Sequence, residues 1–206
     1  MTSFRPAWSL FLLSLTTISA EAELSPVCSD GLGTNCNAQP GCRLTVTLGA
    51  LSPDCEVSVP LSAWTKTAPS LSLSGNSCPT TGGKKMGLLM TDPDAPYCDS
   101  PAAKYWLHWL VLDSNLAGRK VELESGQVIA PFAPPTPPRA PPGSPPFHRY
   151  QFILFAYSSV KAPLTRDGVE SLMNDRMKFR DQFADLFEDY DVVAQTEIRT
   201  QSDHRL

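Results

Sequence analysis

The sequence predicts a single, mostly β domain built on an antiparallel sheet. Short runs in which apolar and polar residues alternate recur from residue 43 onward, and prolines separate them. No helical pattern lies between these runs, which favours antiparallel strands over alternating strand–helix units. With 206 residues, 42% of them hydrophobic and 18% charged, the chain is long enough for one domain with a substantial core.

The first 22 residues have the build of a secretory signal. Arg5 lies in a short leading region, an apolar stretch covers residues 7–18, and Ala20-x-Ala22 is a small-residue cleavage pattern. Serines and threonines interrupt the stretch, and a membrane span needs about 20 apolar residues, so we expect a cleaved signal and no transmembrane anchor. The mature protein is then secreted or held in an endomembrane lumen such as the lysosome.

All six cysteines follow this signal and fall in the first half of the chain. An even number of cysteines in an exported protein indicates disulfide bonds, although the sequence does not decide their pairing. A C-x-x-C pair, the usual mark of a structural zinc site, does not occur. Residues 23–42 are expected to be a stapled N-terminal extension. The disulfide candidates are Cys28, Cys36, Cys42, Cys55, Cys78 and Cys98.

The domain itself is expected to span residues 43–201, followed by a polar tail at 202–206. Apolar residues alternate over 44–48, which predicts a half-buried strand, and 57–59 and 71–73 predict two shorter strands. The continuous apolar run 86–90 predicts a buried central strand that delivers Asp92 to a sheet edge.

The next strand is predicted at residues 106–112, and residues 121–129 alternate more loosely. Residues 130–146 then hold nine of the 20 prolines in the chain, which predicts a stiff, extended loop. Aromatic and β-branched residues at 149–157 predict another strand after this loop. A final strand is expected to begin near Val192.

Two helices are expected near the C-terminus. Asp167 and Glu170 have the spacing of a capping box, which predicts a short helix over residues 167–174 with Asp167 as its N-cap. Apolar residues then recur at helical spacing and predict an amphipathic C-terminal helix. These residues are Phe179, Phe183, Leu186, Phe187 and Tyr190.

Two segments carry the polar residues that suggest a binding site. The turn 92–96 (DPDAP) combines two carboxylates with two prolines, so it is acidic and rigid. It leads to an aromatic strand in which alternation places Trp106 and His108 on one face, and Leu107 and Trp109 on the other.

The same alternation places His148 and Tyr150 on one face of the later strand, with Arg149 on the other. The two segments can converge to bind an anion, because imidazole N–H groups and the Tyr150 hydroxyl are hydrogen-bond donors. Asp92 would orient a histidine and raise its basicity.

These motifs, T-D-P-D-A-P at 91–96, W-x-H at 106–108 and H-R-Y at 148–150, resemble the phosphatidylethanolamine-binding protein family, which includes the Raf kinase inhibitor proteins. The similarity is greatest to the secreted, cysteine-bearing vertebrate branch. The resemblance implies a large central antiparallel sheet packed with a smaller sheet and a few peripheral helices, including the C-terminal amphipathic helix.

The resemblance also implies a shallow pocket for phosphate, a phosphoethanolamine head group of phospholipid, or another small anion. It implies a non-enzymatic protein with no catalytic residues, no cofactor and no metal. In the family a cis peptide lies in the acidic turn, which points to Ala95-Pro96. The ligand-binding residues that it suggests are Asp92, Pro96, Trp106, His108, His148 and Tyr150.

The sequence departs from the family pattern just ahead of H-R-Y. Where the family has G-x-G-P-P, residues 138–142 read PRAPP, so a proline and an alanine replace two glycines whose N–H groups could approach an anion. Arg139 and Ala140 are then expected at the rim of the pocket, where Arg139 could supply a compensating charge.

The leading interpretation is a secreted binding protein that modulates a signalling partner such as a kinase. A metal-dependent hydrolase using Asp92, His108 and His148 is one alternative, although neither G-x-S-x-G nor H-E-x-x-H occurs. A protein-interaction module with a vestigial pocket is another. A net charge of −4 argues against nucleic acid as a partner.

Overall fold

The computed structural model describes residues 36, 40–78, 82–97, 105–174 and 179–201. The predicted signal 1–22, most of the extension 23–42, Cys28, Cys98 and the tail 202–206 lie outside these residues. Within the described part of the chain, no helix is both long and apolar enough to cross a membrane.

Nine strands form one curled sheet. They are β1 (Arg43–Thr47), β2 (Ser58–Val59), β3 (Ser70–Ser74), β4 (Lys85–Asp92), β5 (Trp106–Ala117), β6 (Lys120–Glu122), β7 (Gln127–Ala130), β8 (Phe147–Tyr157) and β11 (Asp191–Gln201). Their order is β1-β3-β6-β5-β4-β8-β11-β2, and β7 pairs separately with β5. All of these pairs are antiparallel except β2–β11, which is parallel. The predicted strands are thus confirmed, with one parallel edge.

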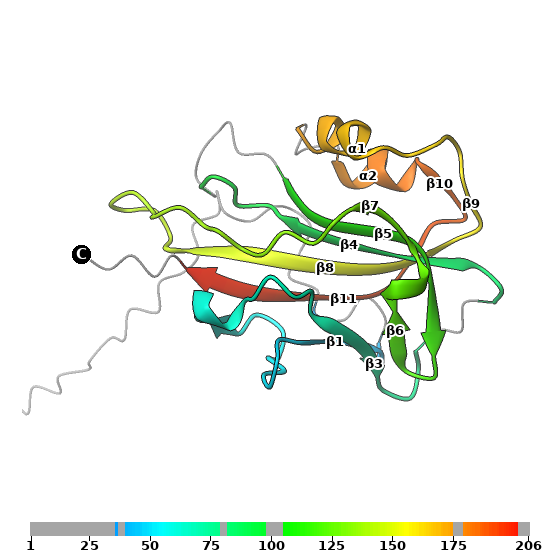
Figure 1. Ribbon diagram of the computed structural model, residues 1–206, viewed down its shortest axis with the longest axis horizontal. Coiled ribbons are helices and arrows are strands. Elements are labelled where there is room, and N and C mark those ends of the chain that lie inside the picture. Colours follow the sequence, from blue (N-terminus) through cyan, green and yellow to red (C-terminus); the bar gives the residue numbers. More distant parts are fainter. Residues whose placement is uncertain (1–35, 37–39, 79–81, 98–104, 175–178, 202–206) are drawn as a thin grey trace, which may run out of the picture.

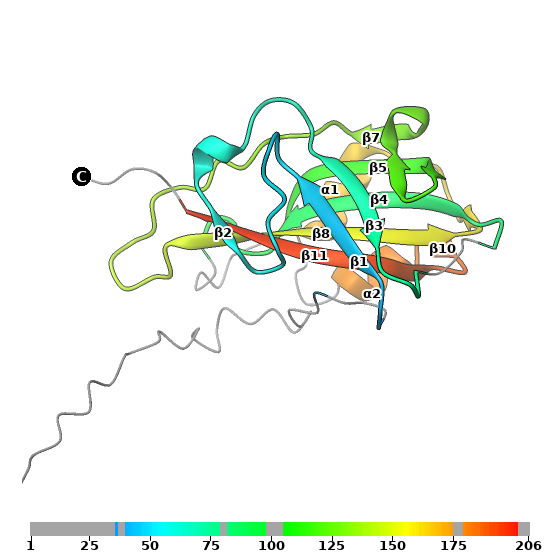
Figure 2. The ribbon, with the colours of Figure 1, turned by 90° about the horizontal axis from the view of Figure 1, so that it is seen from below.

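The long strand β5 explains the curl, because its first part pairs with β4 and its last residues pair with β6. The sheet therefore folds over, and β1 and β3 lie across β8 and β11 (Figures 1 and 2). This folded-over end belongs to the nine-stranded sheet, and the predicted smaller sheet is a separate two-stranded one. Between the two layers lies a core that includes Leu44, Val46, Leu71, Met86, Leu88, Met90, Phe152 and Leu154.

Two short helices, α1 (Arg166–Met173) and α2 (Phe179–Ala184), cover the opposite face of the sheet (Figure 1). A separate two-stranded sheet pairs β9 (Ser159–Val160) with β10 (Phe187–Glu188). The second core lies between the helices and the sheet. It includes Leu89, Leu107, Leu110, Phe155, Val169, Met173, Phe183 and Phe187.

The first helix has its N-cap two residues earlier than the sequence predicted. Its N-cap is Thr165, whose hydroxyl accepts a hydrogen bond of 3.2 Å from the N–H of Gly168. Asp167 lies inside the first turn, where its carboxylate interacts favourably with the positive end of the helix dipole. Glu170 pairs with Arg166 instead of closing a capping box.

The predicted C-terminal helix is much shorter than its apolar spacing suggested. It ends at Ala184, Phe187 belongs to β10, and the chain turns at Asp189, which has a φ of 52°. The aromatic rings still gather on one side because Phe183, Phe187 and Tyr190 all contact Phe155, from a helix, a strand and a turn. The helical spacing of these aromatic residues therefore reflects their shared contact with Phe155 and not one continuous helix.

Two disulfides close the N-terminal part of the described chain, Cys36–Cys55 and Cys42–Cys78. Cys42 immediately precedes β1, and Cys78 follows the adjacent strand β3, so this bond joins neighbouring strand ends. Cys55 lies in the loop before β2, where its sulfur accepts a 3.4 Å hydrogen bond from the N–H of Glu197. All described cysteines are thus paired, which indicates an oxidising environment.

Candidate functional site

The six residues suggested for ligand binding line one cavity of about 320 Å³. Strand order brings them together, because the end of β4 lies between the beginnings of β5 and β8. The end of β4 contributes Asp92, and the turn after it contributes Pro96. Each neighbouring strand then adds two residues, Trp106 and His108 from β5, and His148 and Tyr150 from β8.

A β-bulge lies at His108, which lines this cavity. Met90 is opposite Trp109 and Thr91 is opposite Leu107, so His108 is the extra residue of β5. Leu107 packs under the helices, whereas Trp109 packs in the core between the sheet layers. The prediction that Trp109 shares the face of Leu107 was therefore wrong, because the bulge interrupts simple alternation.

Asp92 and His148 form a buried pair at the base of the cavity. The Nδ1–H of His148 donates to Asp92 Oδ2 over 2.7 Å, and Asp92 Oδ1 accepts from the N–H of Asp94 over 2.8 Å. Burial alone would lower the pKa of His148, but the hydrogen bond and charge of Asp92 outweigh it and raise that pKa. Asp92 therefore stabilises the protonated form of the His148 ring relative to the same ring without this carboxylate.

His108 has the opposite character. Its Nδ1 lies 2.7 Å from the carbonyl oxygen of Ala133, and since a carbonyl only accepts, Nδ1 carries the hydrogen. Burial lowers the pKa of His108 and favours the neutral ring, despite opposing contributions from Ala133 and Asp92. Its second nitrogen, Nε2, has no hydrogen-bond partner within the described residues and carries a lone pair.

The hydroxyl of Tyr150 is the only buried side-chain nitrogen or oxygen in the described part of the chain that lacks a hydrogen-bond partner. The residue is 0% exposed, and its ring lies 5.2 Å from His108 and 5.6 Å from Trp64. Burial, together with the negative charges of Asp92 and Asp94, raises the pKa of Tyr150. The hydroxyl thus keeps its proton and is an unused donor at the cavity wall.

The proline-rich loop 130–146 supplies the remaining wall. Residues 131–146 form no helix or strand, and Thr136, Pro137 and Pro138 line the cavity. The N–H of Ala133 donates to the carbonyl of His108 over 2.8 Å, which fastens the loop to the bulge. Proline density identified the loop in the sequence, but no pattern indicated which of its residues would face inward.

The two residues predicted at the rim do not line the cavity, and Arg139 is exposed to solvent. Ala95, which was not among the predicted ligand-binding residues, does line it. The wall also includes Pro138, which has no N–H to offer a ligand. Trp106 forms an outer wall and is 48% exposed. The peptide bond between Ala95 and Pro96 is cis, as predicted.

The acidic turn is held from behind by a buried ion pair. Asp94 is 1% exposed and Arg149 is 3% exposed, and Arg149 donates to Asp94 from Nε over 2.9 Å and from Nη2 over 2.6 Å. The backbone N–H of Arg149 also donates to this carboxylate over 2.9 Å. Arg149 therefore faces away from the cavity, as alternation predicted, and ties the turn to β8.

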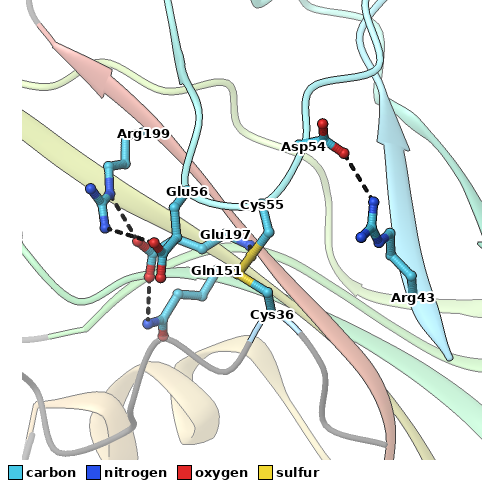
Figure 3. The surroundings of a disulfide bond; sticks show 8 residues. All are labelled: Cys36, Arg43, Asp54, Cys55, Glu56, Gln151, Glu197 and Arg199. Atoms are coloured by element: carbon cyan, nitrogen blue, oxygen red, sulfur yellow. Dashed lines mark hydrogen bonds and ion pairs between the residues drawn. A yellow bond between two sulfur atoms is a disulfide. The ribbon is translucent and has the colours of Figure 1, made fainter. Parts of the chain in front are cut away.

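The charged network continues across β8 and β11 towards the Cys36–Cys55 disulfide (Figure 3). Buried Glu197 accepts from Gln151 Nε2 and from Arg199 Nε, each over 3.3 Å, and Arg199 also pairs with Glu56 at 3.7 Å. Burial raises the pKa of Glu197 although these neighbours and Arg149 oppose the shift. The loop that carries Cys55 thus runs along β11, where the N–H of Glu56 donates to the carbonyl of Glu197 over 2.8 Å.

Within the described residues, no three His, Cys, Asp or Glu side chains come together as metal ligands. The ligand set required by the hydrolase alternative is therefore not found in this part of the chain. Each cavity histidine instead uses its Nδ1 in a hydrogen bond, His108 to Ala133 and His148 to Asp92.

Comparison with known proteins identifies the same kind of domain. A family model described as phosphatidylethanolamine-binding protein matches residues 45–188. A carboxypeptidase Y inhibitor, solved in complex with its cognate proteinase, is 18% identical, with 78% of this chain and 83% of that chain covered and a TM-score of 0.57.

Two phosphatidylethanolamine-binding proteins from malaria parasites have a similar fold. The Plasmodium vivax protein is 18% identical, with 79% of this chain and 86% of that chain covered and a TM-score of 0.55. The Plasmodium falciparum protein is 17% identical, with 78% and 85% covered and a TM-score of 0.55. At this level of identity the likeness concerns the fold.

Proposed function

The chain belongs to the phosphatidylethanolamine-binding protein family, and we propose that its cavity binds the polar head group of a small anionic ligand such as phosphoethanolamine, without catalysing a reaction. The observation that carries this proposal is the unpartnered hydroxyl of buried Tyr150. Buried donors are normally satisfied, and an oxygen of a ligand would satisfy this one.

The neighbouring side chains have complementary roles in this proposal. The ring of His148 lies beside the Tyr150 ring, and the raised pKa that it owes to Asp92 makes it the group that would supply positive charge to the ligand. Pro96 and Trp106 form apolar walls that exclude water from the polar contacts. A cavity of about 320 Å³ is at the small end of the range of ligand pockets, which suits a head group.

We further propose that the protein is an exported member of the secreted, cysteine-bearing branch of the family. The two disulfides support this, because such bonds persist in the extracellular space and in endomembrane lumens. Its action would be to modulate a protein partner, such as a component of kinase signalling. A similarly folded protein, the carboxypeptidase Y inhibitor, was solved in complex with its cognate proteinase.

The proposal is tested by titrating the purified protein with phosphoethanolamine. Binding should change the fluorescence of Trp106 and the NMR signals of His108 and His148, because all three residues line the cavity. The chain contains four tryptophans, so a Trp106→Phe variant assigns the fluorescence signal. Spectra that stay unchanged at millimolar ligand would contradict the proposed function.

A further inference from the structure

The proline-rich loop displays one hydroxyl that the proposed head-group site leaves unused. Thr136 lies at the centre of the run 134–138, which reads PPTPP, and it is the only serine or threonine of the chain with a proline on each side. Pro135 and Pro137 are buried, whereas Thr136 between them is exposed and also lines the cavity. The loop thus holds this side chain at the mouth of the cavity, where solvent reaches it.

The backbone around Thr136 is fixed before any partner arrives. A residue that precedes a proline is driven away from helical angles towards an extended conformation, and each proline fixes its own φ. Residues 131–141 accordingly belong to no helix, strand or turn. An enzyme that binds such a segment orders little of the chain, so little conformational entropy is lost on binding. The segment therefore suits an enzyme that modifies side chains on an extended peptide.

The hydroxyl of Thr136 is not committed to the fold. Among the described residues, neither this hydroxyl nor the backbone groups of Thr136 have a hydrogen-bond partner. Other threonines are committed. Thr165 caps α1, and Thr200 accepts a 2.8 Å hydrogen bond from the indole N–H of Trp64. The Thr136 oxygen can consequently form a new covalent bond without breaking a contact of the domain.

Ser144 shows what the structure adds to the sequence pattern. It lies in the same loop and also precedes a proline, Pro145. Its N–H, however, donates to the carbonyl of Pro141 over 3.0 Å, which closes a turn, and the residue is half-buried. An enzyme that needs an extended segment would have to open this turn. Thr136 is thus the better acceptor of the two.

We propose that Thr136 is the acceptor of an O-linked sugar, added by a glycosyltransferase during export. This inference rests on the proposed export of the protein. Serine or threonine among prolines is typical of O-glycosylated segments. In the transfer, the Thr136 oxygen bonds to the anomeric carbon of a nucleotide-activated sugar. The bond from that carbon to the nucleoside diphosphate breaks, the diphosphate leaves with the electron pair, and the hydroxyl proton passes to a base of the transferase.

The position of Thr136 gives the sugar a consequence for the cavity. Because the residue is both exposed and part of the lining, an attached sugar stands at the entrance. Asp92 and His148 lie deeper, since both are buried and bonded to each other. The sugar should therefore slow the entry of a head group.

The test maps peptides of the full chain, produced in cultured animal cells and recovered from the medium and the endomembrane lumen. Trypsin cuts after Lys120 and Arg139, so Thr136 lies in peptide 121–139 and Ser144 lies in the peptide that follows. We expect the mass of one or more sugar residues on the first peptide and none on the second. No standard N-x-S/T sequence occurs in the chain, so this sugar is O-linked.

Fragmentation that keeps the sugar attached should place it on Thr136. The only other serine or threonine of peptide 121–139 is Ser125, whose hydroxyl donates to the carbonyl of Glu122 over 2.9 Å. Thr136→Val has nearly the same shape but cannot accept a sugar, so the added mass should be lost. Ser144→Ala is the matched control in the same loop and should keep it. A sugar that persists on peptide 121–139 of Thr136→Val would overturn the inference.

The outcomes separate this inference from the proposed export. Exported wild-type protein in which Thr136 carries no sugar, or carries a phosphate instead, would overturn the inference alone. Protein that stays in the cytosol would overturn the proposed export and this inference with it.

The effect on the cavity is measured by stopped-flow mixing with phosphoethanolamine, before and after enzymatic removal of the sugar. Association should be several-fold faster once the sugar is removed. Equal rates would overturn the position of the sugar at the entrance. If neither form binds, the proposed head-group function is wrong, whereas the peptide map still decides whether Thr136 is the acceptor.

Discussion

Buried tyrosine hydroxyls normally find a hydrogen-bond partner, and two tyrosines of β8 differ in this respect. Tyr157 donates to Asp113 Oδ1 over 2.7 Å and accepts from the N–H of Asp113 over 3.0 Å. Tyr150 makes neither kind of contact. Both rings are almost completely buried, so a comparison of the two residues isolates the effect of the hydrogen bonds that the hydroxyl makes.

Tyr150→Phe should therefore cost no stability, and it should weaken phosphoethanolamine binding about tenfold by removing the donor. Tyr157→Phe is the matched control on the same strand. It should leave binding unchanged but cost about 1 kcal/mol, or about 2–4 °C in Tm. Thermal denaturation and titration of both variants check this. A Tyr150→Phe variant that binds like the wild type would contradict the role of the hydroxyl.

Glu197 makes the stability of the protein depend on pH. Its pKa is raised above the ordinary value of 4.5, so the folded protein holds this proton more tightly than the unfolded chain does. The resulting stability is fully present below 4.5 and is lost as the pH rises through the raised pKa. Burial of the carboxylate is the cause of this loss.

Glu197→Gln should consequently lose less stability than the wild type between about pH 4 and pH 8, since it has no proton to release. Urea unfolding at both pH values measures the difference. Glu56→Gln, which neutralises a half-buried carboxylate of the same network, is the control and should follow the wild type. Parallel curves for Glu197→Gln and the wild type would show that burial of Glu197 does not control this dependence.

At the scale of elements, the acidic turn depends on what lies behind it. Asp92 faces the cavity, while Asp94, two residues later, faces the other side and binds Arg149. His148 and Arg149 are neighbours in β8, so both carboxylates fasten the turn to the same strand. The turn is thus held on both faces of the sheet.

Asp94→Asn should cost about 3 kcal/mol or more, because a buried arginine loses its bidentate carboxylate. Asp54→Asn removes an ion pair with Arg43 in which both side chains are largely exposed, and it should cost less than about 1 kcal/mol. Equilibrium unfolding in urea gives both values. Similar costs for the two variants would mean that the buried pair contributes no more than a surface pair.

The strand positions could be predicted from the sequence. A strand buried on one face alternates apolar and polar residues, and a strand buried on both faces is a continuous apolar run. The cavity residues Asp92, His108 and Tyr150 were found through motifs. The face of Trp109 was missed because a bulge adds a residue that no sequence pattern marks. The long C-terminal helix was an error since Phe187 reaches the same aromatic neighbour from a strand.

At the scale of the whole molecule, the two disulfides constrain the part of the chain that lies before the central strands. Cys36–Cys55 closes a separation of 19 residues and Cys42–Cys78 one of 36. Cys42 is also buried in the core between the sheet layers, whereas the sulfur of Cys55 contacts the N–H of Glu197 in β11.

Replacing each pair with alanine should cost about 3–4 kcal/mol, because the unfolded chain regains the entropy of the closed loop. The Cys42/Cys78 variant should lose more than the Cys36/Cys55 variant, since its loop is longer and Cys42 leaves a space in the core. Denaturation without reducing agent ranks the two. The reverse order would show that the contacts around Glu197 depend on the shorter loop.

The proline-rich loop has a consequence for how fast ligands exchange. Its prolines fix the backbone before a ligand arrives, and Ala133 is already fastened to His108. Little ordering entropy then remains to be lost on binding. Different head groups should meet the same preformed wall at similar association rates, so the cavity will discriminate between them chiefly by how long each one stays.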